Sequence, residues 1–318
     1  MNLKQMYDFV ISAGIEKDPR GKKEVLTVLK EKNEEYQKLD KTKKENFDLD
    51  TLTNPYHDSR ILYGTGKETI KNIMVGIDME VPELLLANQL KNNGKKIDMV
   101  LAHHPEGKAF STFYNVINMQ SEIINNQGVP INIAQSYISD RASEVCRGVY
   151  GQNHQRVTDA ARLLNIPLMT AHTVADNHVV NYLQTKLDKL APRYLENIIN
   201  FLEEIPEYKY AMTFSNGPFI LNGSKKSKCG KIFVDMTGGA EGPTELIEHL
   251  AKAGVGTVVG MHMSEKNYKA AVKNKINVII AGHISSDNLG VNLLLDSLEK
   301  KYGKLEYIEA SGFRRFRH

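Results

Sequence analysis

Apolar runs alternate with amphipathic segments along most of the chain. The first run, residues 70–78 (IKNIMVGID), has the length and apolar content of a buried strand. An amphipathic segment follows at 81–94 and ends at Gly94, a residue that commonly terminates helices. A second apolar run covers 97–102. Strand, helix and strand in this order form a βαβ unit, which predicts a parallel pair of strands.

The same alternation continues toward the C-terminus. Further strands are predicted at 129–135, 166–171, 230–236, 256–261 and 276–282, with a hairpin at 208–223. Further helices are predicted at 111–127, 139–149, 155–164, 178–204 with a break near Pro192, 244–254, 265–274 and 287–301. This pattern predicts an α/β fold: two α/β lobes with mixed, largely parallel sheets flanked by helices.

The first 66 residues follow a different pattern. Residues 3–13 predict a short helix that stops near Gly14, and 22–39 predict a Lys/Glu-rich helix with one apolar stripe. The polar segment 40–55 is predicted to be a loop. We therefore divide the chain into an N-terminal helical extension and loop (1–66), a first α/β lobe (67–184) and a second α/β lobe (185–318).

Composition and charge exclude several classes of protein. Hydrophobic residues make up 41% and charged residues 25%, so wholesale disorder is excluded. A net charge of +3 does not favour nucleic acid or an anionic membrane as a partner. Two cysteines exclude a disulfide scaffold and a Cys-rich zinc site. Without a signal-peptide pattern or a long apolar stretch, we expect a cytoplasmic protein with no membrane partner.

Histidine follows four of the apolar runs directly. These residues are His103 with His104, His172, His262 and His283. The carboxyl ends of parallel strands form the edge at which open α/β sheets bind ligands. A single histidine there is more often an ordinary loop residue, but four cases in one chain favour a functional site.

Carboxylates accompany two of these histidines. Asp176 lies four residues after His172, and Asp287 lies four residues after His283, so each pair shares one face of a helical turn. Imidazole nitrogens and carboxylate oxygens suit zinc, iron or manganese. The adjacent histidine pair points to opposite sides of an extended chain. This arrangement favours two neighbouring ions, with a carboxylate between them, over a single ion.

Two other segments leave alternatives open. The Gly-rich turn at 238–242 could hold a phosphate on its backbone amides, but a simple strand-to-helix turn is favoured because no Walker-type Lys-Ser/Thr follows. The tail at 312–318 mixes bases and aromatics, which favours a solvated or subunit-contacting end over an RNA platform. No G-x-S-x-G motif is present, so the usual serine-hydrolase elbow is excluded.

Several segments together resemble a known family. They are NIMVGIDMEVPELLLANQL, IDMVLAHHP, AHTVAD, GKIFVDMTGGAEGP and AGHISSDNLGVNLLLDSL, within about residues 54–313. In them the chain resembles the Nif-three-like family, whose bacterial members are often labelled GTP cyclohydrolase type-two homologues. Members carry a strand-ending His-His-Pro, a His-Thr…Asp loop, a Gly-rich turn and a C-terminal Gly-His…Glu. The N-terminal 50 residues have no counterpart.

The resemblance implies a dinuclear metal site in a cleft between two α/β lobes. Carried over by position, each histidine of the His-His-Pro pair would hold one ion, with Asp176 on one, His283 on the other and Asp287 between them. Aspartate stands at this last position where the family usually has glutamate, and a helix N-cap is the alternative role for Asp287. Candidates for proton transfer or substrate contact are His172, His262, Glu106 and Glu241.

Two classes of function are compatible with such a site. The first is a metal-dependent hydrolase that uses two divalent ions (zinc, iron or manganese) on a nucleotide or another small phosphorylated or cyclic substrate. The second is a non-catalytic, metal-loaded ring protein that acts in metal handling or protein interaction, with the charged helix 22–39 as its distinctive surface. By resemblance, the chain is expected to form a homo-oligomer, namely a hexamer.

Overall fold

Two sheets form the framework of the computed structural model, which describes residues 1–318. In spatial order, the first sheet contains β1 (Ile61–Tyr63), β4 (Leu168–Thr170), β3 (Met99–Ala102), β2 (Asn72–Gly76) and β9 (Glu306–Glu309). The second sheet contains β5 (Phe219–Asn222), β8 (Asn277–Ile280), β7 (Val255–Gly260) and β6 (Lys231–Asp235). Neighbouring strands are parallel, except that β1 is antiparallel to β4 and β5 to β8. The predicted mixed, largely parallel α/β class is confirmed.

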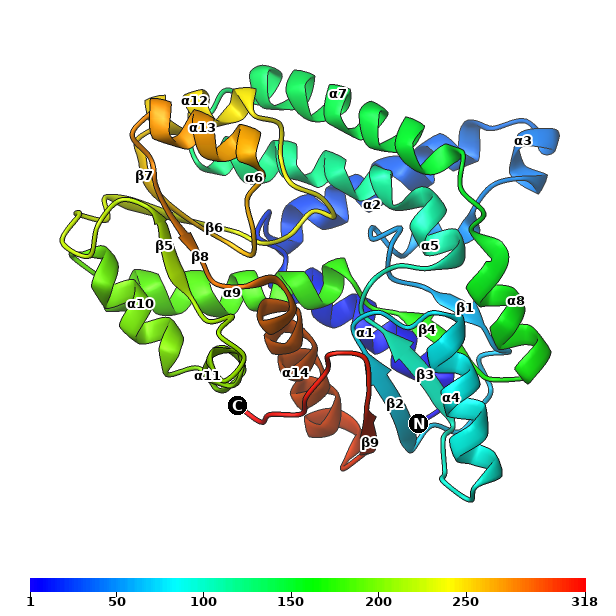
Figure 1. The fold of residues 1–318 in the computed structure, drawn as a ribbon. Coiled ribbons are helices and arrows are strands. Elements are labelled where there is room, and N and C mark those ends of the chain that lie inside the picture. Colours follow the sequence, from blue (N-terminus) through cyan, green and yellow to red (C-terminus); the bar gives the residue numbers. More distant parts are fainter.

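Helices flank both sheets (Figure 1). In the first half of the chain they are α1 (Leu3–Lys17), α2 (Lys22–Lys38), α3 (Lys41–Glu45), η1 (Leu49–Leu52), α4 (Val81–Asn92), α5 (Gly107–Thr112), η2 (Phe113–Met119), α6 (Gln120–Asn126) and α7 (Ile131–Tyr150). In the second half they are α8 (Gln155–Leu164), α9 (Thr173–Leu190), α10 (Leu195–Glu203), α11 (Pro206–Met212), α12 (Glu245–Lys252), α13 (Glu265–Lys273) and α14 (His283–Tyr302).

The long helices α9 and α14 cross the middle of the molecule (Figure 1) and contribute to the cores of both lobes. Val174 of α9 and Leu294 of α14 pack in the core of the first sheet, whereas Leu183 and Leu289 pack against the second. Helices α4 and α8 cover the other face of the first sheet, and α6, α7 and α12 cover that of the second. Both faces of each sheet are therefore buried, which explains why the strands are continuous apolar runs.

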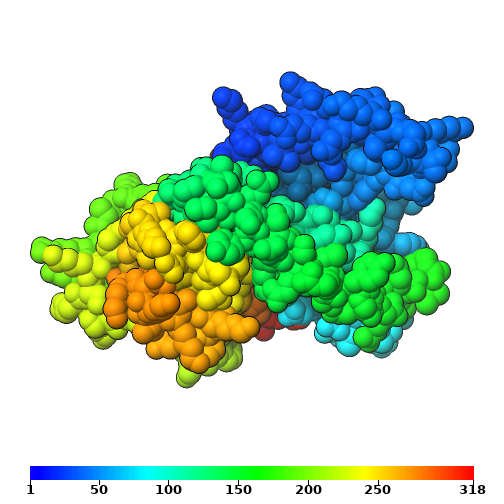
Figure 2. Space-filling view, turned by 90° about the horizontal axis from the view of Figure 1, so that it is seen from above, coloured from blue at the N-terminus to red at the C-terminus, as the bar shows by residue number.

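The N-terminal extension is part of the first lobe's core. Leu3, Met6 and Val10 of α1 are completely or almost completely buried there. The predicted stop near Gly14 is wrong, because α1 continues to Lys17. A Cβ atom on Gly14 would lie 2.7 Å from Cγ1 of Val174, so this glycine allows α1 to pack closely against α9. Figure 2 shows the N-terminal segment lying along one edge of the molecule.

The predicted strand at 129–135 is wrong. Most of this segment belongs to α7, which begins at Ile131. Its buried residues Ala134, Ile138 and Ala142 recur every four positions, so the helical period of the longer segment prevails over the local apolar alternation. Pro130 precedes the first turn, where proline is well tolerated.

The predicted hairpin at 208–223 is also wrong. Its first half lies in α11, which has proline at its first position and buries Tyr208 in the core. Only β5 is a strand, and its partner is the distant β8. Asn216 ends the helical turn by donating its backbone N–H to Ala211, so the SNGP sequence leads out of a helix.

The last strand returns to the first lobe. β9 pairs in parallel with β2, from Asn72↔Glu306 to Val75↔Glu309. The division of the chain into 1–66, 67–184 and 185–318 stays a prediction. None of the helices combines the length and the apolar character needed to cross a membrane.

Candidate metal centre

The carboxyl ends of strands from both sheets supply the histidines of one cluster. His103 and His104 follow β3, His172 follows β4, and His283 follows β8 as the first residue of α14. The two aspartates lie near the starts of the helices that begin there: Asp176 in the first turn of α9, and Asp287 as the fifth residue of α14. All five predicted metal ligands and His172 are therefore brought together, although they come from segments up to 184 positions apart.

A small residue allows α9 and α14 to approach each other at the cluster. A Cβ atom on Gly290 would lie only 2.5 Å from the backbone oxygen of Ala175. Ala175 precedes Asp176, and Gly290 lies less than one turn after Asp287. The absence of a side chain at Gly290 therefore lets the two helices place their carboxylates at the same site.

The oxygens of Asp287 are divided between two groups of ligand atoms. Its Oδ1 lies 3.4 Å from Nε2 of His103, which in turn is 3.5 Å from Oδ1 of Asp176. Its Oδ2 lies 3.4 Å from Nε2 of His104 and 3.6 Å from Nε2 of His283. Asp287, which is 1% exposed, therefore lies between the two groups.

The spacing of these atoms suits metal coordination better than hydrogen bonding. Good N–H···O hydrogen bonds measure about 2.7–3.2 Å, whereas tetrahedral zinc ligands at about 2.0–2.1 Å from the ion lie about 3.3 Å from one another. Nε2 of His103, Oδ1 of Asp176 and both oxygens of Asp287 are buried without a hydrogen-bond partner. Buried polar atoms rarely lack partners, so the cluster fits a cation that supplies the missing contacts.

Hydrogen bonds at the other ring nitrogen orient three of the imidazoles. Nδ1 of His103 lies 3.1 Å from the backbone oxygen of Ala171 and donates to it. Nδ1 of His104 lies 2.6 Å from Asp78, and Nδ1 of His172 lies 2.9 Å from Asp58. For the two predicted ligands His103 and His104, a proton held at Nδ1 leaves the lone pair of Nε2 free for a metal ion, which is the usual arrangement around metal-binding histidines.

Comparison with solved structures relates this geometry to known proteins. A NIF3 superfamily protein from Sphaerobacter thermophilus is 28% identical, with a TM-score of 0.69, and the match covers 80% of this chain and 91% of that chain. This similarity in sequence and fold supports a NIF3-like family assignment for the chain. The predicted family resemblance is confirmed.

Two further matches to solved structures have lower similarity. Reduced HcgD from Methanocaldococcus jannaschii is 15% identical with a TM-score of 0.47, over 83% of this chain and 93% of that chain. The protein TTHA1606 from Thermus thermophilus is 15% identical with a TM-score of 0.46, over 80% and 89%. No protein-family model and no curated protein matches the sequence.

Burial and ion pairing separate the pKa values of the clustered groups in the metal-free protein. Burial lowers the pKa of His103 to about 4. Burial also lowers the pKa of His172, but the neighbouring Asp176 and Asp58 outweigh this effect and raise that pKa to about 9. Burial raises the pKa of Asp176 to about 8, whereas the neighbouring imidazoles overcome burial and hold the pKa of Asp287 far below its ordinary range. Asp287 is thus ionised and His103 neutral, the forms in which they bind metal, whereas Asp176 would lose its proton on binding.

Two carboxylates that orient histidines were missed at the sequence level. Asp78 is the last residue of the run at 70–78, at the same sheet edge as the histidines, and this position could have indicated it. Asp58 lies in an irregular segment with no periodic signal. Its carboxylate is fully buried and also accepts a hydrogen bond of 2.6 Å from Thr173, which only the folded chain reveals.

The N-cap alternative for Asp287 is wrong. Helix α14 begins at His283 with Gly282 as its N-cap, so Asp287 is the fifth residue of the helix. The predicted spacing does hold, since His283 and Asp287 face each other across one turn.

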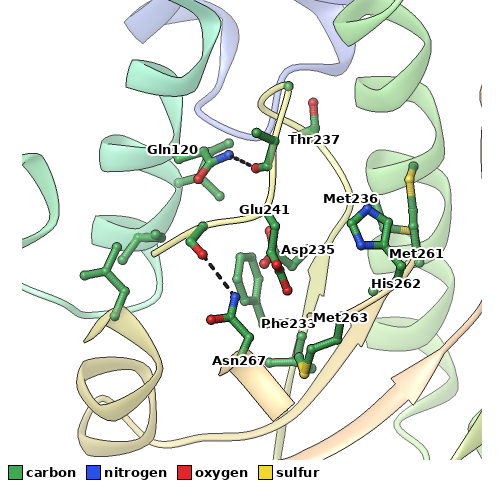
Figure 3. A pocket seen from close by; sticks show the side chains of 18 of the residues that line it. Gln120, Phe233, Asp235, Met236, Thr237, Glu241, Met261, His262, Met263 and Asn267 are labelled. Carbon is green, nitrogen blue, oxygen red and sulfur yellow. Dashed lines mark hydrogen bonds between the residues drawn. The ribbon is translucent and has the colours of Figure 1, made fainter. Parts of the chain in front are cut away.

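A cavity of about 130 Å³, partly open to solvent, adjoins the cluster. His172, Asp176 and His283 line one part of it, and the Gly-rich turn at 239–242 lines another. Gln120 holds this turn by donating to the backbone oxygens of Gly238 and Ala240 (Figure 3).

The other predicted candidates lie outside the ligand cluster. The ring of His262 is exposed and lies 5.0 Å from that of His283, at the cavity wall. Glu241 also lines the cavity and accepts a hydrogen bond of 2.8 Å from the backbone of Ser264. Glu106 precedes α5, and burial together with nearby acids raises its pKa to about 7.

Proposed function

We propose that the cluster binds two divalent metal ions with Asp287 between them, and that this NIF3-like protein is a metal-dependent hydrolase. The division of the Asp287 oxygens between two groups of ligand atoms carries the proposal. One ion would be held by His103, Asp176 and Asp287, and the other by His104, His283 and Asp287. His172 would support the first group through its contact with Asp176.

The residue types favour zinc, iron or manganese, because imidazole and carboxylate ligands suit these ions. Divalent ions bound here would activate a water molecule and polarise a phosphoryl or carbonyl oxygen. The protein's own contribution is orientation: Asp78, Asp58 and the oxygen of Ala171 hold the imidazoles so that each presents Nε2 to the centre. This orientation is achieved before any substrate binds.

The cavity beside the cluster supports catalysis over simple metal storage. Its lining joins metal-facing residues, an apolar wall and a Gly-rich turn, a combination typical of small-molecule sites. A nucleotide or another small phosphorylated or cyclic molecule is the proposed substrate. Glu106, Glu241 and His262 are the candidate proton carriers. Ring assembly, with six copies, is expected from the family resemblance.

Chelation tests the catalytic half of this proposal. Purified protein is assayed for phosphate release from nucleotides and for hydrolysis of cyclic phosphodiesters, before and after removal of metal. We expect chelation to abolish turnover, and zinc, iron or manganese to restore it. Unchanged turnover in metal-free protein, or metal-loaded protein that hydrolyses none of these substrates, would contradict the hydrolase assignment.

A further inference from the structure

Asp235 is a carboxylate placed on an apolar face. It is the last residue of β6, and Phe233, two positions earlier on the same face, is 3% exposed in the second lobe's core. Asp235 therefore continues an apolar row at the point where the strand leaves the sheet. Its side chain is exposed and lines the cavity beside the metal cluster.

No group of the protein neutralises this carboxylate. Asp235 makes no hydrogen bond or ion pair through its side chain, and burial and the nearby charge of Glu241 raise its pKa to about 6. No lysine or arginine forms an ion pair with Asp235 or lowers its pKa. An exposed carboxylate that no protein group pairs, set in a cavity lined partly by apolar side chains, is available to a ligand.

A second carboxylate faces the same space. Figure 3 shows the side chains of Asp235 and Glu241 directed into one part of the cavity. Glu241 is held by the N–H of Ser264, which it contacts through one oxygen only. Two carboxylates around one space favour a cation there over an anionic group, because a cation attracts both of them.

The surroundings favour an organic cation over a metal ion. None of the residue groups that could hold a metal contains Asp235 or Glu241. The cavity wall around them is instead apolar, with Phe233, Leu246 and Val258. At another part of the same cavity lies Asp176, whose Oδ1 is buried and unpartnered. One ligand could therefore contact both the metal centre and Asp235.

We propose that Asp235, with Glu241 beside it, binds a guanidinium or alkylammonium group of the substrate. The proposal rests on the proposed function in one respect: the rest of that substrate reaches the metal centre. Asp235 then determines specificity, because it selects molecules that combine a cationic nitrogen group with an apolar body. A guanidinium group suits the site well, since its parallel N–H donors match a carboxylate in a bidentate pair.

The test uses two probes of the same shape and different charge, n-butylguanidinium and the neutral n-butylurea. The full-length protein carries methyl-¹³C-methionine, because Met261 and Met263 line the cavity and report on binding by NMR. We expect both methyl signals to shift and saturate with n-butylguanidinium, with an affinity at least about tenfold higher than for n-butylurea. In Asp235→Asn this preference should disappear. In Asp140→Asn, which removes an exposed carboxylate from α7, it should persist.

Two results would overturn the proposal. One is equal binding of the two probes, or no saturable binding of either, in the wild-type protein. The other is an undiminished guanidinium preference in Asp235→Asn. The methionine spectrum itself reports whether the variant is folded, and Asp235→Ala provides a second variant without the carboxylate.

The same titration in His104→Ala separates this proposal from the metal centre. His104 does not line the cavity, so we expect the guanidinium preference to persist in that variant while metal binding falls. A guanidinium preference without two-ion binding would overturn the proposed function alone. Two-ion binding without a guanidinium preference would overturn only the role of Asp235.

Discussion

Asp287 illustrates how single residues prepare this site. It is almost fully buried and lacks a well-formed hydrogen bond, yet it stays ionised because the imidazoles of His103 and His104 face it. Such an arrangement costs folding free energy unless a further cation completes it. A metal ion bound to Asp287 would supply this missing cation.

Replacing Asp287 with asparagine keeps the shape and removes the charge. We expect Asp287→Asn to bind zinc at least about tenfold more weakly at one or both positions, because ligand charge and orientation control affinity. Calorimetric titration of the metal-free variant measures this, with Asp188→Asn at the exposed end of α9 as the control. Wild-type affinity and stoichiometry in Asp287→Asn would remove this residue from the site.

Asp235 predicts a pH effect of defined sign. Its pKa is raised to about 6 in the folded protein, so the unfolded chain loses this proton at lower pH than the folded one. The stability contribution is therefore present below about pH 4 and is lost as the pH rises to about 6. The unfolding temperature of Asp235→Asn should rise relative to that of the wild type between about pH 4 and about pH 6. Above this range the difference between the two unfolding temperatures should stay constant. A constant difference from pH 4 to 8 would contradict this assignment.

At the scale of elements, much of the fold follows from sequence and the missed parts have physical reasons. Apolar runs predict the strands that precede His103, His172 and His283, because a strand buried on both faces needs such a run. The segment at 129–135 predicts a strand because apolar and polar residues alternate over its short length. The helical period becomes visible only over the longer segment that forms α7. The approach of α9 to α14 depends on Gly290 and Ala175, whose contact no local pattern encodes.

The contact of these two helices gives a prediction of its own. Gly290→Ala places a Cβ atom 2.5 Å from the backbone oxygen of Ala175, so the helices must separate. We expect a loss of about 1–3 kcal/mol in unfolding free energy, together with weaker metal binding, despite the better helix propensity of alanine. Denaturant unfolding measures the first effect. Gly148→Ala on α7, where nothing lies within 4 Å, should be neutral or stabilising by up to about 1 kcal/mol. Equal effects at both positions would contradict the account.

At the scale of the whole molecule, a chain of buried polar contacts links the N-terminal extension to both lobes. Tyr56 donates to Asp18 at 2.8 Å, and Asn177 on α9 donates to Tyr56 at 3.2 Å. Thr237, at the start of the Gly-rich turn in the second lobe, donates to Asn177 at 2.8 Å. The extension is therefore connected to the cavity wall, although the sequence alone suggested an appended segment.

Removing one hydroxyl from this chain tests its importance. Tyr56→Phe deprives buried Asp18 of a donor and Asn177 of an acceptor, and we expect a loss of about 1–3 kcal/mol in unfolding free energy. Tyr150→Phe is the control, because Tyr150 is 85% exposed. Chemical denaturation of both variants measures the difference. If Tyr56→Phe proved as stable as the control, the network would not hold the extension in place.

Metal stoichiometry tests the central claim most directly. Metal-free wild type, His103→Ala and His104→Ala are each titrated with zinc in a calorimeter, and the saturated proteins are analysed for bound metal. We expect about two ions per chain in the wild type. Each variant should lose a different one of the two binding events, since the two histidines face different oxygens of Asp287. Saturation of the wild type at one ion per chain, with His103→Ala and His104→Ala equivalent in effect, would contradict the dinuclear centre.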